Sequence, residues 1–204
     1  MTGYANIERV EGAGKKLALT FDDGPDEQYT QQILDILQQY NVHATFFMVG
    51  EQLDRNPALA RAVHEAGHEI GNHTQTHPFL AELDVAAIRS ELTQMEDRIV
   101  RVTGAKPVTF RPPYFSANDT VFEVVVNEFR YKPIGAVNLA AQDWDSPGTP
   151  HIVDKTMESV CDGGIFIFHD GYGDRSQTVE AIRILVPRLL QKGYELVRVD
   201  QLFG

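Results

Sequence analysis

The sequence predicts an α/β fold and, within that class, an irregular (β/α) barrel of about seven parallel strands. Short apolar runs alternate along the chain with amphipathic helical patterns, which is typical of parallel strands joined by crossover helices. No Gly-x-Gly-x-x-Gly follows the first apolar run, which argues against a doubly wound dinucleotide-binding sheet. About seven strands and about six helices are too few for a regular eightfold barrel, so an irregular one is expected.

The predicted strands are short runs of apolar residues bounded by turn formers. Leu17-Ala18-Leu19-Thr20-Phe21 is such a run and ends at Asp-Asp-Gly-Pro, as expected of a buried strand followed by a loop. A second run stops at Gly50. The predicted strands cover residues 17–21, 44–49, 69–71, 108–111, 132–137, 165–168 and 195–199.

The predicted helices are marked by apolar residues at helical spacing and by capping signals. Asn56-Pro57 and Thr149-Pro150 each combine a capping residue with a proline that suits the first helical position. Asp84 is expected to cap a long amphipathic helix that stops near Gly104. The predicted helices cover residues 30–40, 57–66, 84–103, 118–129, 149–161 and 178–191.

The length and the charge of the chain limit its organisation and its partners. With 204 residues, one domain over 1–204 is expected, with 1–15 as an N-terminal extension. The net charge of −11 and the absence of any Lys/Arg run longer than Lys15-Lys16 argue against nucleic acid and anionic membranes as partners. A neutral substrate such as an uncharged sugar polymer suits this balance better.

Targeting and cysteine signals are weak. No stretch approaches the ~18 apolar residues of a membrane span. Residues 1–7 lack the charged-then-apolar pattern of a signal peptide. The single cysteine, Cys161, excludes an internal disulfide and is interpreted as a small packing residue.

Clusters of polar residues follow five of the predicted strands. Because the active sites of (β/α) barrels lie at the carboxyl ends of their strands, these clusters are the candidate site. They are Asp22-Asp23-Gly24-Pro25, His73-Thr74-Gln75-Thr76-His77, Arg111-Pro112-Pro113-Tyr114, Asp143-Trp144 and His169-Asp170-Gly171.

The first two clusters predict a metal site. His73 and His77 are four residues apart, so both rings can reach one ion, and two histidines with one carboxylate form a standard catalytic zinc set. Asp22 or Asp23 can supply the carboxylate, and burying both would be costly without a cation. The other aspartate could then act as a base toward water activated by the metal. The alternatives are an ordinary turn for the aspartates and a structural pair of histidines.

Two further residues complete a hydrolytic constellation. His169 ends a buried strand and can supply the acid that a leaving group needs. Arg111 precedes two prolines, and such a rigid loop can hold a backbone N–H against an oxyanion; a surface ion pair is the alternative for Arg111. The other histidines are assigned structural or solvated roles: His43, His64, His68 and His151.

In these motifs and in their order the sequence resembles the polysaccharide deacetylases with the NodB homology domain, carbohydrate esterase family 4. The resemblance runs from about Lys16 to the C-terminus and includes Thr20-Phe21-Asp22-Asp23-Gly24-Pro25, His73-Thr74-Gln75-Thr76-His77, Arg111-Pro112-Pro113-Tyr114, Asp143-Trp144 and Ile167-Phe168-His169. Ala140 and Ile167 depart from the family pattern, where aspartate and leucine are common, and they leave substrate preference open.

The resemblance implies an irregular (β/α) barrel, a reaction on acetylated sugars and one divalent metal ion, zinc in first place and cobalt or another divalent ion as alternatives. It also implies a role for each motif residue. Asp23, His73 and His77 would be metal ligands, Asp22 the general base oriented by Arg111, His169 the general acid paired with Asp143, Tyr114 the oxyanion donor through its backbone N–H, and Trp144 and Ile167 part of the acetyl pocket.

The functional hypothesis is therefore a zinc-dependent hydrolase that removes acetyl groups from N-acetylglucosamine units of a chitin oligosaccharide or of peptidoglycan. An O-acetyl esterase acting on acetylated xylan would use the same apparatus, and a noncatalytic carbohydrate-binding domain is a more distant alternative. A metallophosphoesterase is disfavoured because such enzymes use two-metal sites with more ligands. The resemblance implies an extracellular or cell-envelope location.

Overall fold

The structure, a computed structural model, describes residues 4–204 and consists of a parallel sheet surrounded by helices. The strands follow the order β5-β4-β3-β2-β1-β6, with β7 paired to β1, and every pair is parallel. The predicted (β/α) barrel class is therefore confirmed. The strands are β1 (Lys16–Asp22), β2 (Thr45–Met48), β3 (Glu69–Asn72), β4 (Thr109–Phe110), β5 (Lys132–Pro133), β6 (Ile165–His169) and β7 (Glu195–Leu196).

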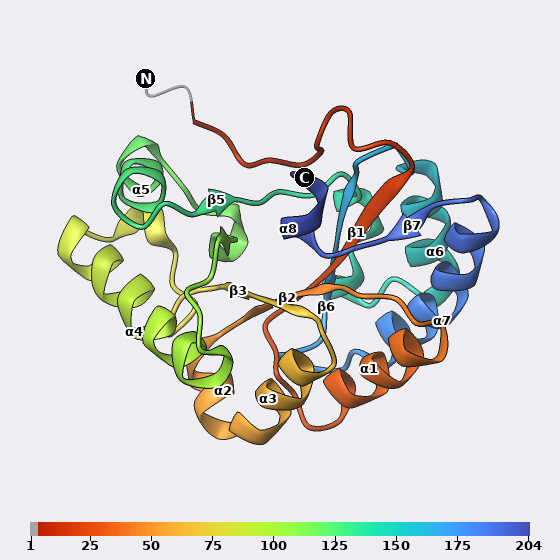
Figure 1. Ribbon diagram of the computed structural model, residues 1–204, viewed down its shortest axis with the longest axis horizontal. Helices are drawn as coiled ribbons and strands as arrows, with labels where there is room; N and C mark the ends of the chain where they lie inside the picture. Colours follow the sequence, from red (N-terminus) through yellow and green to blue (C-terminus); the bar gives the residue numbers. More distant parts are fainter. Residues whose placement is uncertain (1–3) are drawn as a thin grey trace.

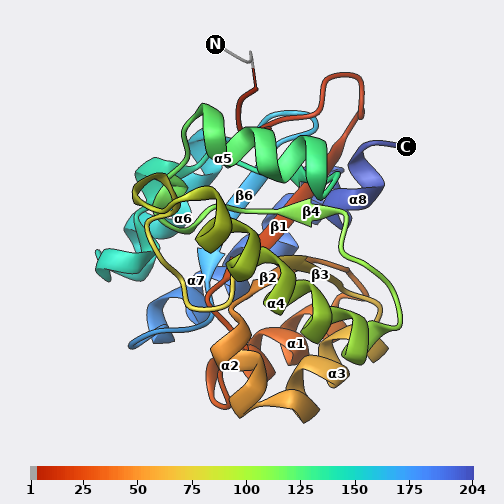
Figure 2. The same cartoon turned by 90° about the vertical axis from the view of Figure 1, so that its left-hand side faces the viewer.

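The helices form an outer layer around the strands (Figure 1). Figure 2, turned by 90°, shows β4 between α5, above it, and α4, below it. The α-helices are α1 (Tyr29–Gln39), α2 (Gly50–Arg55), α3 (Pro57–Glu65), α4 (Val85–Thr103), α5 (Asp119–Glu123), α6 (Thr149–Glu158), α7 (Ser176–Gln191) and α8 (Val199–Leu202). Short 3₁₀ turns are η1 (Leu80–Glu82), η2 (Pro113–Phe115), η4 (Leu139–Ala141) and η5 (Asp143–Asp145), and η3 (Val124–Glu128) is a π-turn.

The central strand β1 explains why the polar strand ends face the barrel interior. Leu19 and Phe21 belong to the main apolar core, which lies between the sheet and the helices. Side chains alternate along a strand, so Thr20 and Asp22 point to the other face, into the barrel. Both are buried there, and both accept hydrogen bonds from the same guanidinium group. The carboxyl end of β1 thus delivers Asp22 into the barrel mouth.

Residues 7–10 bridge the two edges of the sheet. Ile7 donates a backbone hydrogen bond of 2.8 Å to Pro133 at the end of β5 and accepts one of 2.8 Å from Gly135. On the other edge, Ile165 of β6 donates to Glu8 (3.0 Å) and Val10 donates to Gly163 (2.9 Å). Figure 1 shows this segment running along β5 toward β1 and β6. It therefore satisfies backbone groups that would otherwise form open sheet edges.

Several predicted boundaries are wrong, each for a tertiary reason. The strand predicted at 44–49 does end before Gly50, but the sequence did not predict α2, which begins at Gly50 and whose first N–H groups donate to the carbonyls of Thr74 (3.0 Å) and Gln75 (3.0 Å). The strand predicted at 195–199 ends at Leu196, since Val199 starts α8 and donates to the hydroxyl of Thr45 (2.9 Å). Both segments are set by partners that are distant in sequence.

Other differences concern where elements stop. The strand predicted at 132–137 is only two residues long, because the chain then leaves β4 and bonds to the N-terminal segment. The helix predicted at 118–129 changes to the π-turn η3 after Glu123. The helix predicted at 149–161 ends at Glu158, and its N-cap is Gly148. The cap at Asp84 is confirmed, since its side chain accepts from the Ala87 N–H.

Two sequence expectations concern the N-terminal end and membranes. Residues 1–3 lie outside the described residues, and with them part of the predicted extension 1–15 and of the segment inspected for a signal pattern. Within residues 4–204, no helix combines the length and the apolar character needed to cross a membrane.

Candidate active site

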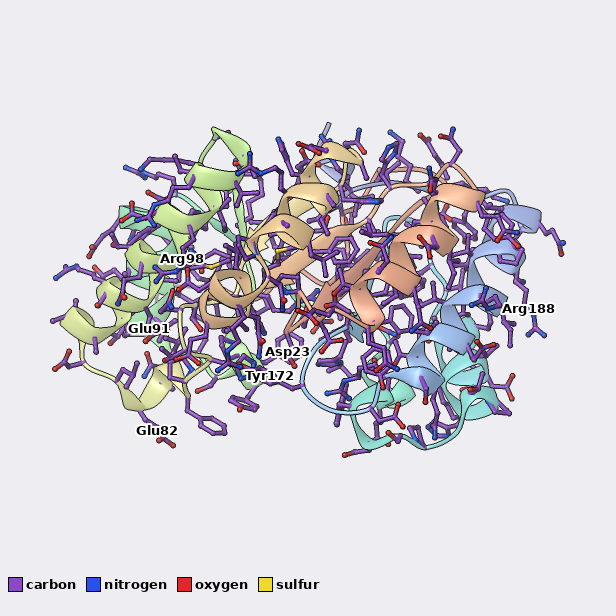
Figure 3. All side chains as sticks on the ribbon, turned by 90° about the horizontal axis from the view of Figure 1, so that it is seen from below. Asp23, Glu82, Glu91, Arg98, Tyr172 and Arg188 are labelled. Carbon is purple, nitrogen blue, oxygen red and sulfur yellow. The ribbon has the colours of Figure 1, made fainter. Side chains whose placement is uncertain are left out.

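The five polar clusters converge on one cavity at the carboxyl ends of the strands. The cavity has a volume of about 610 Å³, and all predicted site residues except Asp143 line it. Asp23 and Tyr172 lie close together at this end of the molecule, whereas Arg188 of α7 lies far from them on the outside (Figure 3). The lining residues are Asp22, Asp23, His73, Thr76, His77, Arg111, Pro112, Tyr114, Phe115, Trp144, Ile167, His169, Tyr172 and Arg175.

Asp23, His73 and His77 form a compact group of candidate metal ligands. One potential ligand atom from each lies within 4.8 Å of the other two. The Nε2 atoms of His73 and His77 lie 3.4 Å and 3.0 Å from Asp23 Oδ1. Within residues 4–204, no other group of three such side chains has this arrangement. The second aspartate of the pair, and not the first, therefore faces both histidines.

The hydrogen bonds around His73 leave a free lone pair directed at this group. His73 Nδ1 lies 2.7 Å from the backbone carbonyl of Arg111. A carbonyl oxygen only accepts, so Nδ1 carries the proton and, in the neutral ring, Nε2 keeps its lone pair. Such a second bond, from the nitrogen that does not bind metal, is characteristic of histidine ligands.

Asp23 also has the properties of a ligand. Its Oδ1 atom is buried and makes no well-aligned hydrogen bond, although both rings lie beside it. Burial raises the pKa of Asp23, but His73 and His77 and the charge of His169 lower it well below its usual range. A buried, ionised and unpaired carboxylate oxygen next to two imidazole nitrogens fits a divalent cation of the zinc class.

Asp22 is held by the fully buried Arg111. Arg111 Nη1 donates to Asp22 Oδ1 over 2.7 Å and to the hydroxyl of Thr20 over 2.6 Å. Its other nitrogens donate to the carbonyls of Ile134 (3.2 Å) and Gly135 (2.8 Å). Arg111 is therefore part of the barrel interior, and the alternative of a surface ion pair is wrong. Asp22 Oδ2 remains 3.7 Å from His73 Nε2, on the side of the candidate metal ligands.

At the end of β6, beside Asp22 in the sheet, Asp143 fixes His169. His169 Nδ1 lies 2.8 Å from Asp143 Oδ1, and the His169 backbone N–H donates to Asp143 Oδ2 over 2.7 Å. Thr178 of α7 holds that second oxygen as well (2.9 Å). Burial lowers the pKa of His169, but the charge and hydrogen bond of Asp143 and the charges of Asp23 and Asp22 raise it to about 9. His169 is therefore protonated at neutral pH, with Nε2 as its remaining donor.

Strained backbone is concentrated around the cavity. Ten described non-glycine residues have positive φ, and five of them line the cavity: Asp23, His77, Tyr114, Phe115 and Tyr172. This conformation is costly for non-glycine residues and is often found at functional sites. Tyr114, with φ of 56°, has this conformation inside the turn η2. That turn begins at Pro113 and directly follows Pro112. The strained residues are therefore concentrated in the loops that form the cavity wall.

Two aromatic residues and one apolar residue complete the walls. Trp144 lines the cavity and makes an edge-to-face contact with His169, at 5.6 Å between ring centroids, and Ile167 lines the cavity as well. Tyr172 and Arg175 were not predicted, although they follow His169 in the same loop. Arg175 is buried and donates to the carbonyl of Gly171 over 2.7 Å and to that of Tyr172. The only sequence signal for these residues was their place after a strand end.

The histidines set aside in the sequence lie away from the cavity. His68 is buried and its Nδ1 accepts the backbone N–H of Ala44 over 3.1 Å, so its role is structural. Burial lowers the pKa of His68 to about 4, and His43 and Arg198 add to this effect. His151 is half-buried, and its Nε2 lies 3.1 Å from the carbonyl of Ala140. Cys161 forms no disulfide and is half-buried, so it is less buried than the sequence interpretation implies.

Comparison with known proteins gives relatives of one kind. The family model described as polysaccharide deacetylase matches residues 9–133. A peptidoglycan-N-acetylglucosamine deacetylase of Bacillus cereus is 38% identical over 201 residues, which cover 98% of this chain and 93% of that protein. A chitooligosaccharide deacetylase of Rhizobium leguminosarum bv. trifolii is 33% identical, with coverage of 92% and 91%.

Solved structures agree with the sequence relatives. The Bc1960 peptidoglycan N-acetylglucosamine deacetylase superposes with a TM-score of 0.89 and 30% identity, over 93% of this chain and 88% of that one. BA3943 of Bacillus anthracis, described as a family pseudoenzyme, superposes with a TM-score of 0.89 and 28% identity, over 98% and 69%. The family match, the identities and the shared barrel show that this chain belongs to the polysaccharide deacetylases with the NodB homology domain, carbohydrate esterase family 4.

Proposed function

We propose that the protein is a metal-dependent hydrolase that removes acetyl groups from N-acetylglucosamine units of a polysaccharide, either a chitin oligosaccharide or peptidoglycan. The observation that carries the proposal is that Asp23, His73 and His77 open into the same cavity as Asp22 and His169. The relatives named as peptidoglycan-N-acetylglucosamine and chitooligosaccharide deacetylases support this substrate class. A peptidoglycan substrate would place the protein at the cell envelope.

The donor set favours a divalent metal ion of the zinc type. Asp23, His73 and His77 would hold one divalent ion, for which zinc is the first candidate and cobalt or another divalent ion an alternative. When bound, the ion supplies a Lewis acid for the acetyl carbonyl and makes water easier to deprotonate. Three protein ligands leave a coordination position open, as catalytic zinc sites require.

Asp22 is placed to act as the general base. Arg111 fixes one of its oxygens, so the second, Oδ2, is presented to the region between the candidate ligands and the cavity. There Oδ2 can take the proton of the water that attacks the acetyl carbon. Positioned proton transfer of this kind typically contributes about 10²–10⁴-fold to a rate.

Tyr114 and His169 would act on the other two atoms of the reaction. The backbone N–H of Tyr114, in a rigid turn at the rim, would donate to the oxygen that becomes negatively charged. His169 would donate its Nε2 proton to the departing nitrogen of the sugar. An amine leaves poorly without that proton, and a His169 pKa of about 9 keeps the proton available at neutral pH.

The proposal is tested by acetate release from N-acetylated chitooligosaccharides, peptidoglycan and acetylxylan, each with and without a chelator. We expect release from at least one N-acetylated substrate, its loss with the chelator and its recovery with zinc. A His77→Ala variant, which removes a ligand, should remain inactive after zinc is added. Release that survives removal of the metal, or release from acetylxylan alone, would contradict the proposal.

A further inference from the structure

Most of the exposed aromatic side chains lie at the cavity or next to it. Within residues 4–204, five aromatic side chains are at least about a third exposed: Tyr4, Phe79, Tyr114, Trp144 and Tyr172. Three of them line the cavity, and Phe79 stacks against one of those three. Aromatic surface that folding leaves in water and that gathers around a cavity marks a binding surface. Phe79 is the member of this group that stacks on a lining residue without lining the cavity itself.

Phe79 and Tyr114 form a two-ring stack that extends outward from the candidate metal ligands. The Tyr114 ring packs at 66° to His77, with 4.6 Å between ring centroids. The Phe79 ring lies nearly parallel to Tyr114, at 14° and 4.1 Å. Phe79 itself does not line the cavity, so it stands one ring beyond the cavity wall. Each ring keeps a large free surface, with 49% of Phe79 and 58% of Tyr114 exposed.

The stack is held in place from both sides. Two residues before Phe79 is His77, and the next residue, Leu80, is fully buried in the core under α4 and α5. The loop of Phe79 is also bonded to the loop of Tyr114, since the Ala81 N–H donates to Ser116 Oγ (3.2 Å) and Asn118 Nδ2 donates to the Ala81 carbonyl (3.2 Å). The exposed rings are therefore pre-organised, which lowers the entropy cost of binding a ligand.

We propose that Phe79, supported by Tyr114, binds the sugar unit next to the one that is deacetylated, so that it determines a preference for chains over single sugars. This inference rests on the proposed function. The C–H groups on the face of a pyranose ring form a flat apolar surface that stacks on an aromatic ring, and a polysaccharide that enters the cavity continues past its rim. Phe79 is a ring away from the cavity, so its occupant is the neighbouring unit and not the reacting one.

The test compares the wild type, Phe79→Ala and Phe79→Trp on N-acetylglucosamine and on its β-1,4-linked oligomers of increasing length, up to the pentamer. For the oligomers that reach Phe79, we expect Phe79→Ala to raise KM about tenfold, equivalent to about 1.4 kcal/mol, with kcat unchanged. On the monomer, wild type and Phe79→Ala should have the same kcat and KM. Phe79→Trp should restore the low KM because it keeps an aromatic face. Tyr4→Ala, which removes an exposed aromatic ring outside the cavity lining, should behave as wild type.

Two outcomes overturn the inference. One is a loss of equal size at every chain length, including the monomer. The other is a fall in kcat with unchanged KM, because Phe79 would then only position the Tyr114 turn. Calorimetric titration with the pentamer tests the same point without turnover: about tenfold weaker binding by Phe79→Ala supports the inference, and equal binding refutes it. If no substrate released acetate, the proposed function would fail, while the titration would still decide the role of Phe79.

Discussion

Each candidate catalytic side chain is held by a second residue that leaves one polar atom free. Arg111 occupies one oxygen of Asp22, Asp143 occupies one nitrogen of His169, and the Arg111 carbonyl occupies one nitrogen of His73. The remaining atoms face the shared cavity. The fold alone does not decide activity, since a relative described as a pseudoenzyme has the same fold, so a functional hypothesis depends on the arrangement of these side chains.

At the residue scale, Asp22→Asn should separate catalysis from metal binding. The amide keeps the size of the side chain but cannot take a proton, so we expect turnover to fall by about 10²–10⁴-fold while bound zinc stays near one per chain. Acetate release and metal analysis measure the two quantities. Asp35→Asn on α1 serves as a matched control and should change neither. Near-normal turnover of Asp22→Asn would remove Asp22 from the mechanism.

The pH dependence should report His169. A general acid works only while protonated, so activity should decline as the pH rises through the His169 pKa of about 9. Asp143→Asn removes the main group that raises this pKa, so the alkaline limb of the profile should move to lower pH. Profiles of kcat/KM for both proteins would show the displacement. An unchanged alkaline limb would mean that another group titrates there.

At the element scale, the short helix α2 packs against the loop that carries two of the candidate metal ligands. The helix α2 begins at Gly50, where a side chain would collide with Gln75 of the histidine loop at 1.9 Å. Its first N–H groups bond to the carbonyls of Thr74 and Gln75, so the loop that carries His73 and His77 rests on the start of α2. Glycine allows the Gln75 side chain and its Cα, which a Cβ would approach to 3.1 Å, to pack closely here, with no positive φ involved.

The long helix α4 offers a test of an element that the sequence predicted with its cap. Asp84→Ala removes the side chain that accepts the Ala87 N–H over 2.8 Å. The loss of such a cap typically costs about 1 kcal/mol, which lowers Tm by roughly 2–4 °C in a chain of this size. Asp84→Asn should keep most of the stability because asparagine also caps. Thermal unfolding monitored by circular dichroism checks both, and an unchanged Tm in Asp84→Ala would contradict the prediction.

At the scale of the whole molecule, the candidate metal site joins segments that are distant in sequence. Asp23 follows β1, whereas His73 and His77 follow β3, so a cation held by all three would link two parts of the barrel. Ligands that bind only the folded state stabilise it by mass action. Zinc at about 100 times its Kd should add about 2.7 kcal/mol, or roughly 5–10 °C in Tm.

This thermal shift should depend on the ligands and not on the base. His77→Ala should lose the zinc-dependent rise in Tm, whereas Asp22→Asn should retain it. A scan with zinc, with cobalt and with chelator would also rank the metals. A rise that persists in His77→Ala would place the stabilising ion elsewhere.

The sequence by itself determined the alternation of strands and helices, the cap of α4 and the polar clusters that the fold brings to one cavity. It could do so because these features are local: an apolar run, an Asp before a helical pattern, and polar residues directly after a strand. Recognition of the motifs added the assignment of Asp23, and not Asp22, to the metal. The geometry is consistent with that assignment, since Asp23 Oδ1 is the oxygen nearer to both histidine rings.

Only the tertiary structure decided how distant segments meet. The burial of Arg111 inside the barrel, the start of α2 at Gly50 and the bonds of residues 7–10 to both sheet edges all depend on partners far away in the chain. The same holds for the Phe79–Tyr114 stack, since neither residue signals the other in the sequence. Local patterns specify which groups a segment presents, but their partners are selected by the packing of the whole barrel, which no short stretch of sequence encodes.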